Sequence, residues 1–282
     1  MARSVRWLLL ACILLCTAFP CVSRALTPND MLESALSMLE DGNPFLERYN
    51  AETGRSVQAR FEHGCPYFWG GRSEARLLTV MSAWKSSPGY YIKDQSYVYG
   101  FDCTGFVQWV LLQTGHQPLG AISDALALPV PSPLDIEGSG RATGADLSRL
   151  LRPGDVLAIH HHRNSYHVAM YIGTLREYGY TEKDVSAELL TLLDHPLIIH
   201  CTVSSDYYIR YEDYIEDTYE GAVYPPDGGV IVSVVAPRAL APYTEINPDN
   251  DHTSYFLLDD YQLQVYDLSA DEQTRWLRWP QR

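Results

Sequence analysis

The sequence predicts an α+β protein with a packed core, and one observation supports each part of this expectation. Helical patterns come first along the chain and strand patterns follow, without the regular alternation that indicates βαβ units. Hydrophobic residues make up 46% of the 282 residues, which is enough for a packed core and argues against wholesale disorder. At a usual domain size of roughly 100–200 residues, the chain forms one large domain or two small ones.

Three helices are expected in the N-terminal part of the chain. The first covers residues 27–40 and ends at a Gly-Asn-Pro break. The second covers residues 72–85, where a Ser-Ser-Pro-Gly run follows, and the third covers residues 102–112. Residues 118–144 are rich in Gly, Pro, Ser and Ala, which predicts a long surface loop.

Strands are expected further along the chain, where runs rich in Val, Ile and Tyr are bounded by turn residues. The last two runs are close enough in sequence to form a hairpin. The expected strands are residues 155–160, 167–173, 197–203 and 230–235, and the hairpin pairs residues 255–258 with residues 262–266.

The N-terminus predicts a signal peptide rather than a part of the fold. Two arginines precede an apolar run over residues 7–19, which is shorter than the roughly 20 residues needed to cross a bilayer. Ser23 and Ala25 supply the small residues of a cleavage site. We therefore predict cleavage after Ala25 and a secreted, extracytoplasmic protein of the cell envelope without stable membrane insertion; an uncleaved helical anchor is the alternative.

The charge balance excludes one class of partner. Lys and Arg number 21 and Asp and Glu number 35, which gives a net charge of −14 at pH 7. Nucleic-acid binding depends largely on Lys and Arg side chains that neutralise phosphates. We therefore expect no nucleic acid among the partners of this protein.

Cleavage after Ala25 leaves three cysteines, Cys65, Cys103 and Cys201. Because three is odd, at least one thiol stays unpaired in a monomer. Free thiols outside the cell tend to oxidise, so a retained thiol suggests a chemical role. The chain contains no Cys-x-x-Cys pair, so no zinc site is expected, and we expect no other metal.

Cys103 lies where a nucleophile would be activated. Apolar residues recur at helical spacing from Phe106 onward, which puts Cys103 in the first turn of a helix. The unpaired N–H groups and the dipole of a helix start stabilise a thiolate. The same N–H groups can hold the oxyanion that forms when a thiolate attacks a carbonyl. A cysteine in such a position is also commonly a small buried hydrophobic residue.

Two strands supply histidines that favour the catalytic interpretation. The period of 2 puts His167, Ala169 and Tyr171 on one face of their strand. A histidine at the start of a strand can point at a thiol on a facing helix. His200, within a later apolar strand, can hold the first imidazole in the required tautomer.

Four sequence blocks and a later Ile-His pair occur in a specific order. They are Pro66-Tyr67-Phe68-Trp69-Gly70-Gly71, Asp102-Cys103-Thr104-Gly105-Phe106, Arg152-Pro153-Gly154-Asp155, and His167-Val168-Ala169-Met170-Tyr171-Ile172-Gly173 with the later Ile199-His200. Together they resemble the NlpC/P60 family of cysteine peptidases over about residues 60–205. The resemblance implies a papain-like α+β fold in which the cysteine helix packs on an antiparallel β-sheet. It also implies hydrolysis of peptidoglycan stem peptides, usually at the bond between γ-D-glutamyl and a diamino acid.

The resemblance implies a role for each matching residue. Cys103 is then the nucleophile, His167 the general base, and His200 the residue that orients the base. Tyr67 would help to hold the substrate or the oxyanion, and Asp102 would bind an ammonium group of the stem peptide. The implied substrate-binding residues are Tyr67, Asp102 and Thr104.

Three departures from the family pattern matter. Thr104 stands where the family usually has serine, and its extra methyl group narrows the pocket. The segments 71–102 and 173–200 are longer than usual, and the first of them can cover the cleft. Because of the second, His195 competes with His200 for the orienting role, although the proline that follows it disfavours it.

The remaining thiols flank predicted site residues. Cys65 precedes Tyr67, and Cys201 follows His200. We keep a disulfide between Cys65 and Cys201 as a hypothesis, because it would leave Cys103 as the single free thiol.

The expected organisation has four parts. Residues 1–25 form the signal peptide, residues 26–60 an N-terminal helical extension, residues 61–237 the NlpC/P60-like catalytic domain, and residues 238–282 a C-terminal extension.

The expected function is that of an exported thiol peptidase that hydrolyses peptidoglycan stem peptides or muropeptides through an acyl-enzyme and needs no cofactor. Other functions remain open: an amidase or a muropeptide-fragment peptidase with the same site, or a catalytically silent muropeptide-binding protein.

Overall fold

The structure, a computed structural model, describes residues 26–79, 94, 96–116, 136–161, 165–202, 228–246, 252–268 and 273–281. The predicted signal peptide lies outside these residues, so its cleavage stays a prediction. The helices are α2 (Asp30–Leu36), α3 (Pro44–Thr53), α4 (Cys103–Gln113) and α6 (Leu147–Leu150). The strands are β1 (Arg72–Thr79), β2 (Ser96–Phe101), β3 (Gly138–Thr143), β4 (Val156–His161), β5 (Ser165–Thr174), β6 (Pro196–Thr202), β7 (Gly229–Val235), β8 (Tyr243–Ile246), β9 (His252–Leu258), β10 (Tyr261–Tyr266) and β11 (Gln273–Arg278).

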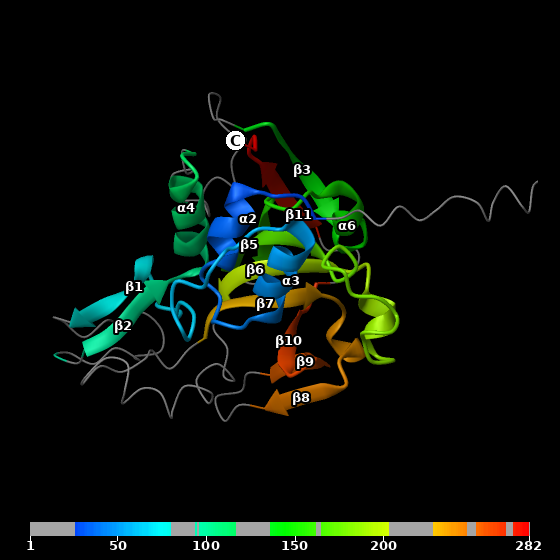
Figure 1. Ribbon diagram of the computed structural model, residues 1–282. Coiled ribbons are helices and arrows are strands. Elements are labelled where there is room, and N and C mark those ends of the chain that lie inside the picture. The colour runs from blue at the N-terminus through cyan, green and yellow to red at the C-terminus, as the bar shows by residue number, and fades with distance from the viewer. Residues whose placement is uncertain are drawn as a thin grey trace, which may run out of the picture.

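Nine of these strands form one sheet in the order β3-β11-β4-β5-β6-β7-β10-β9-β8. Neighbours in this sheet run antiparallel, except that β10 runs parallel to β7. The hairpin of β1 and β2 forms a separate two-stranded sheet that projects to one side of the main sheet (Figure 1).

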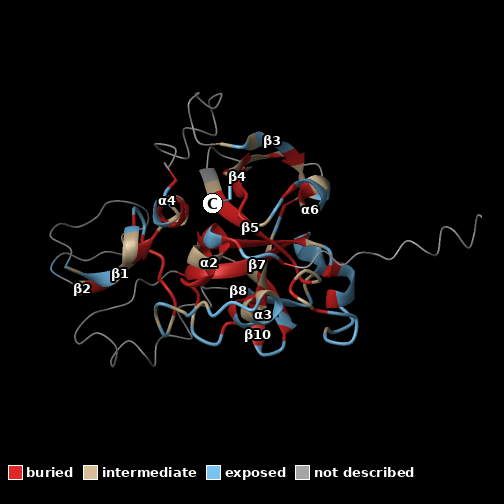
Figure 2. Ribbon diagram, turned by 45° about the horizontal axis from the view of Figure 1, so that its top comes forward, coloured by how far each residue is buried: buried red, intermediate tan, exposed pale blue. Residues whose placement is uncertain are grey.

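The two faces of the sheet have different coverings. Val168, Met170 and Ile172 of β5 belong to the same core cluster as residues of α2, α3 and α4. Ala169 and Tyr171 of β5 belong to a second cluster with residues of β3, β4 and α6. Every residue of β7 is buried, and the central strands are the most buried part of the described fold (Figure 2). Successive side chains of a strand point to opposite faces, and both faces of this sheet are covered by core residues. The runs of Val and Ile in β5, β6 and β7 therefore specify central strands.

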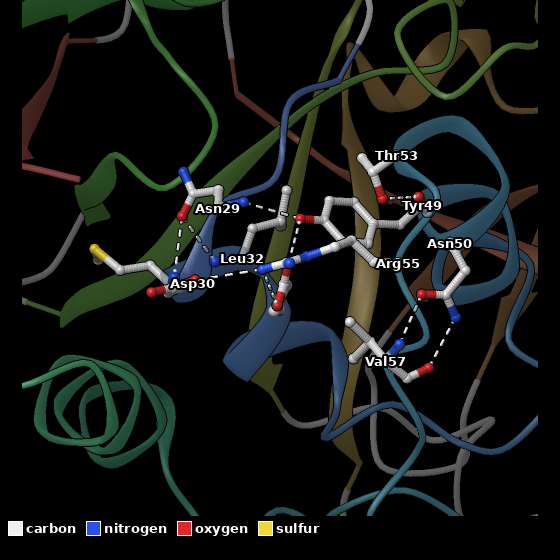
Figure 3. Close-up of polar contacts among 10 residues, drawn as sticks. Asn29, Asp30, Leu32, Tyr49, Asn50, Thr53, Arg55 and Val57 are labelled. Carbon is white, nitrogen blue, oxygen red and sulfur yellow. Dashed lines mark hydrogen bonds and ion pairs between the residues drawn. The ribbon is translucent and has the colours of Figure 1, made fainter. Parts of the chain in front are cut away.

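The N-terminal segment is tied to this core by polar contacts (Figure 3). The buried Tyr49 hydroxyl of α3 accepts from the backbone N–H of Asn29 at 3.0 Å and donates to Glu33 of α2 at 3.1 Å. Arg55 donates to the same Glu33 carboxylate. The Asn29 side chain caps α2 and also donates to the Pro153 carbonyl, 2.8 Å away, before β4. These contacts fix α2 and α3 against the turn that leads into the sheet.

The predicted helix over residues 72–85 is wrong, because residues 72–79 form β1 and residues 80–93 lie outside the described part. The sequence of β1, rich in Arg, Glu, Ala and Leu, favours a helix locally. Pairing with β2, whose Tyr and Val side chains suit a strand, overrides this preference. Arg76 lies opposite Tyr99, with its guanidinium carbon 5.2 Å from the centre of the Tyr99 ring.

The predicted loop over residues 118–144 is also wrong in its last part, which forms β3. Strand β3 pairs with β11, and Gly140 lies directly opposite Trp276. A Cβ at Gly140 would lie 3.0 Å from the indole, so the small residues that suggested a loop instead make room for this ring. Residues 118–135 of that loop lie outside the described part.

The other predicted elements are confirmed to within a few residues. The first helix is shorter than predicted, and Asn29 caps it. The third helix is α4, and the predicted hairpin is formed by β9 and β10. A further strand, β11, follows this hairpin and lies between β3 and β4. Residues 238–282, expected as an extension, thus contribute strands to the same sheet as residues 156–174.

Candidate active site

Helix α4 begins at Cys103 because of the residue before it. The Asp102 carboxylate accepts a hydrogen bond from the Gly105 N–H at 2.6 Å, which caps the helix. Burial raises the pKa of Asp102, and the Gly105 contact partly opposes this shift. The cap therefore engages the carboxylate in positioning Cys103, while binding of a substrate ammonium group by Asp102 stays a prediction.

Close backbone contacts hold the aromatic-Gly-Gly segment against this helix start. The backbone N–H of Asp102 donates to the Gly71 carbonyl at 3.1 Å. A Cβ at Gly105 would collide with that same carbonyl oxygen, and a Cβ at Gly100 would collide with the Pro66 carbonyl oxygen. Only glycine permits these approaches, which explains why glycine stands at both positions.

The Cys103 thiol lies beside strand β5. The backbone N–H of Val168, the residue after His167, donates toward the sulfur, and the Thr104 hydroxyl lies 3.8 Å from it. Burial nevertheless raises the pKa of the Cys103 thiol. The neutral thiol is therefore the resting form, and a thiolate requires a base that accepts the proton. The stabilisation expected from the helix start does not outweigh the burial.

His167 and His200 are joined directly. The Nε2 atom of His167 lies 2.7 Å from Nδ1 of His200, and Nε2 of His200 lies 2.8 Å from the Ser233 hydroxyl. His200 is 2% exposed. Burial, with a smaller contribution from His167, lowers the pKa of His200 well below its ordinary value. His200 is therefore neutral at physiological pH and carries one ring proton.

His195, the competing histidine, lies elsewhere. It precedes the first residue of β6, and its Nδ1 is 3.0 Å from the Val235 carbonyl oxygen at the far end of β7. His200 is near the other end of β6, opposite Ile231. The structure thus brings His200, and not His195, to His167.

Tyr67, Cys65 and Cys201 lie in the core beneath this region. The backbone N–H of Tyr67 donates to the Gly228 carbonyl at 3.0 Å, and its role toward substrate stays a prediction. The hypothetical disulfide is wrong, because Cys65 and Cys201 are both free thiols. The Cys201 thiol donates to the Phe101 carbonyl at 3.2 Å. Burial raises the pKa of both thiols, which keeps them protonated.

Sequence reasoning missed two residues beside the histidines, Ser233 and Tyr266. The Tyr266 ring stacks on His167 with a centroid distance of 5.5 Å and an interplanar angle of 23°. It meets His200 edge-on at 5.6 Å. Ser233 carried a signal, as the single polar residue of the run Val-Ile-Val-Ser-Val-Val. Tyr266 carried none, because only the pairing of β10 with β7 brings it to the site.

A helix-start thiol beside a strand that carries a paired histidine is typical of cysteine hydrolases with an α+β fold. The model of the NlpC/P60 family matches residues 64–188, which confirms the resemblance seen in the motifs. Residues 64–188 are therefore similar to the NlpC/P60 family. Searches of curated proteins and of solved structures found no match.

The match supports the predicted fold class and the predicted type of enzyme. A mixed structure with mostly strands fits a papain-like α+β fold. The family consists generally of cysteine peptidases that act on peptidoglycan, which indicates a cell-wall peptidase. The matched segment ends before His200, Ser233 and Tyr266. In the described part of the chain, the helices are too short or too polar to cross a membrane.

Proposed function

We propose that the protein is an exported cysteine peptidase that hydrolyses peptidoglycan stem peptides, at the bond between γ-D-glutamyl and a diamino acid. The observation that carries the proposal is the 2.7 Å contact between His167 and His200, next to the strand residue whose N–H meets the Cys103 sulfur. The NlpC/P60 match over residues 64–188 supports the substrate class.

The proposed reaction begins with a proton transfer. Nδ1 of His167 takes the proton of the Cys103 thiol, and His200 accepts a hydrogen bond from Nε2 of His167 and so stabilises the imidazolium. The thiolate then attacks the γ-glutamyl carbonyl carbon. The backbone N–H of Cys103, which has no acceptor within the first turn of the helix, donates to the oxyanion.

The second half of the reaction returns the enzyme to its starting form. The C–N bond breaks, the amine of the diamino acid leaves with the proton from His167, and a thioester remains on Cys103. A water molecule gives a proton to the same imidazole and attacks the thioester, which releases the γ-glutamyl carboxylate and restores the thiol. Asp102 and Thr104 flank Cys103 in the sequence, and together with Tyr67 of the aromatic-Gly-Gly segment they are the proposed substrate contacts.

The proposal also includes export. Cleavage after Ala25 would deliver the chain to the cell envelope, where peptidoglycan is found. An amidase that cuts the sugar–peptide bond, a peptidase restricted to soluble fragments, and a silent muropeptide-binding protein are the competing functions.

Product analysis separates these functions. The protein with residues 26–282 is incubated with intact peptidoglycan and, separately, with soluble L-Ala-γ-D-Glu-diaminopimelate peptides, and the products are identified by mass spectrometry. New γ-D-glutamyl carboxylates and free diamino acid ends support the proposal if Cys103→Ala forms neither. Released intact stem peptides would indicate an amidase, and turnover of soluble peptides alone a fragment peptidase. Binding without turnover in both proteins would overturn the enzymatic proposal.

A further inference from the structure

Ser233 is an unexpected residue for its position. It lies in β7, whose other residues from Val230 to Val235 are apolar, and it is 2% exposed. Burying a hydroxyl without a partner costs free energy, so a serine in such a strand needs a hydrogen bond. The Ser233 hydroxyl lies 2.8 Å from Nε2 of His200. The register puts His200 opposite Ile231, two residues from Ser233 on the same face of the sheet.

This contact determines which nitrogen of His200 carries the proton. When His167 becomes an imidazolium, both of its nitrogens carry protons, so Nδ1 of His200 must accept from it. The single proton of the neutral His200 is then on Nε2, and it needs an acceptor in a buried place. The Ser233 oxygen is that acceptor. Without it, the proton on Nε2 would be buried without a hydrogen bond, and the opposite tautomer would place two protons between the two histidines.

Tyr266 restricts the same pair in a second way. Its ring lies nearly parallel to His167, at 23°, and nearly perpendicular to His200, at 81°. A flat ring on one side of His167 limits rotation of the imidazole out of the plane in which Nε2 meets His200.

We propose that Ser233 and Tyr266 are positioning residues for the catalytic histidines, Ser233 by fixing the tautomer of His200 and Tyr266 by fixing the ring plane of His167. Both lie outside residues 64–188, so the C-terminal strands β7 and β10 complete a site that the NlpC/P60 segment only begins. The proposal rests on the proposed function for its catalytic meaning, but the tautomer itself is a physical property that can be measured without turnover.

The first experiment is nitrogen NMR of the ring nitrogens in the Cys103→Ala protein, which removes the titrating thiol beside His167. Among the residues that the structure describes, the titratable side chains of His200 and Tyr266 make ring contacts with His167. We compare Ser233→Ala, Ser233→Thr, which keeps a hydroxyl, and the control Ser254→Ala. Ser254 is equally buried at 2% and its hydroxyl lies 3.2 Å from that of Thr244, in strands β9 and β8.

We expect His200 to carry its proton on Nε2 in the parent protein and in Ser254→Ala. In Ser233→Ala we expect that the ring proton of His200 is no longer fixed on Nε2. We also expect the pKa of His167 to fall by about 0.5 to 1 pH unit, the size of one net hydrogen bond. Ser233→Thr restores both. An unchanged tautomer and pKa in Ser233→Ala, or equal shifts in Ser254→Ala, would overturn the proposal for Ser233.

The second experiment measures kinetics in the protein with Cys103 intact. Ser233→Ala is expected to lower kcat about 3- to 10-fold with KM unchanged. Tyr266→Leu is expected to lower kcat about 2- to 10-fold, whereas Tyr266→Phe, which keeps the ring, stays within about twofold. Equal losses in Tyr266→Phe and Tyr266→Leu would contradict the role of the ring. If the parent hydrolyses nothing while the tautomer still depends on Ser233, the proposed function fails and the positioning by Ser233 stands.

Discussion

The ion pair between Asp155 and Arg278 joins two distant parts of the chain, and its removal should destabilise the whole fold. Arg278 of β11 donates to the Asp155 carboxylate through Nε at 2.7 Å and through Nη2 at 2.5 Å. The same carboxylate accepts the backbone N–H of Arg152 at 2.9 Å, in the turn before β4. The two side chains are only 2% and 14% exposed, so solvent screens their attraction weakly.

The perturbation is Arg278→Met, which keeps most of the packing and leaves the Asp155 carboxylate buried without its cation. Removing one partner of a buried pair costs about 3–5 kcal/mol, so we expect a loss of stability of that size. Asp155→Asn should cost a comparable amount. The double variant Asp155→Asn with Arg278→Met should lose about 2 kcal/mol less than the sum of the single losses, because neither charge is then left alone.

The assay is equilibrium unfolding in urea for the complete double-mutant cycle. The chain contains a matched control in the exposed pair of Arg149 and Asp146, which has a similar distance of 2.8 Å but side chains that are 73% and 40% exposed. The same substitutions there should show a coupling below about 1 kcal/mol. A coupling at Asp155 and Arg278 no larger than at Asp146 and Arg149 would refute the reasoning.

Two further predictions concern the site region. Gly105→Ala should lower the free energy of unfolding by about 1–3 kcal/mol, because the new Cβ would meet the Gly71 carbonyl. Gly138→Ala, where a Cβ meets only the Trp276 ring at 3.5 Å, should stay within about 0.5 kcal/mol, and equal urea midpoints for the two variants would contradict this. The lowered pKa of His200 means that the unfolded chain takes up a proton there before the folded protein does. Below about pH 6.5 the parent should therefore lose roughly 1.4 kcal/mol of stability per pH unit relative to His200→Gln, and parallel stability curves would exclude this.

The fold was predictable where local patterns and tertiary packing agree. The β-branched residues of β5, β6 and β7 suit a buried sheet. The aspartate before Cys103 caps α4, and in the sequence it predicts where this helix begins. The prediction failed at β1 and β3, where the strand exists only because of its partner. The residues of β1 prefer a helix but form a strand because they pair with β2. The glycines of β3 form a strand because they lie against Trp276 of β11.

The candidate site was predictable where its residues lie in contiguous sequence motifs. Cys103 and His167 stand in such blocks, and their strands and helices have the expected positions. The choice of His200 over His195 depended on which end of β6 lies beside His167, which is a property of strand register. Ser233 and Tyr266 reach the site through the pairing of β7 with β6 and β10, over separations for which the sequence has no local pattern.

The most direct test of the central claim is kcat/KM of four proteins on the soluble stem peptide: the parent, His167→Gln, His200→Gln and His195→Gln. A general base contributes about 10²- to 10⁴-fold, so His167→Gln should fall in that range and His200→Gln by about 10²-fold. His195→Gln removes a histidine just before β6 whose ring nitrogen lies near the Val235 carbonyl and not near His167, and it should stay within about twofold of the parent. Full activity in His167→Gln, or a loss in His195→Gln as large as in His200→Gln, would contradict the assignment of the histidine pair.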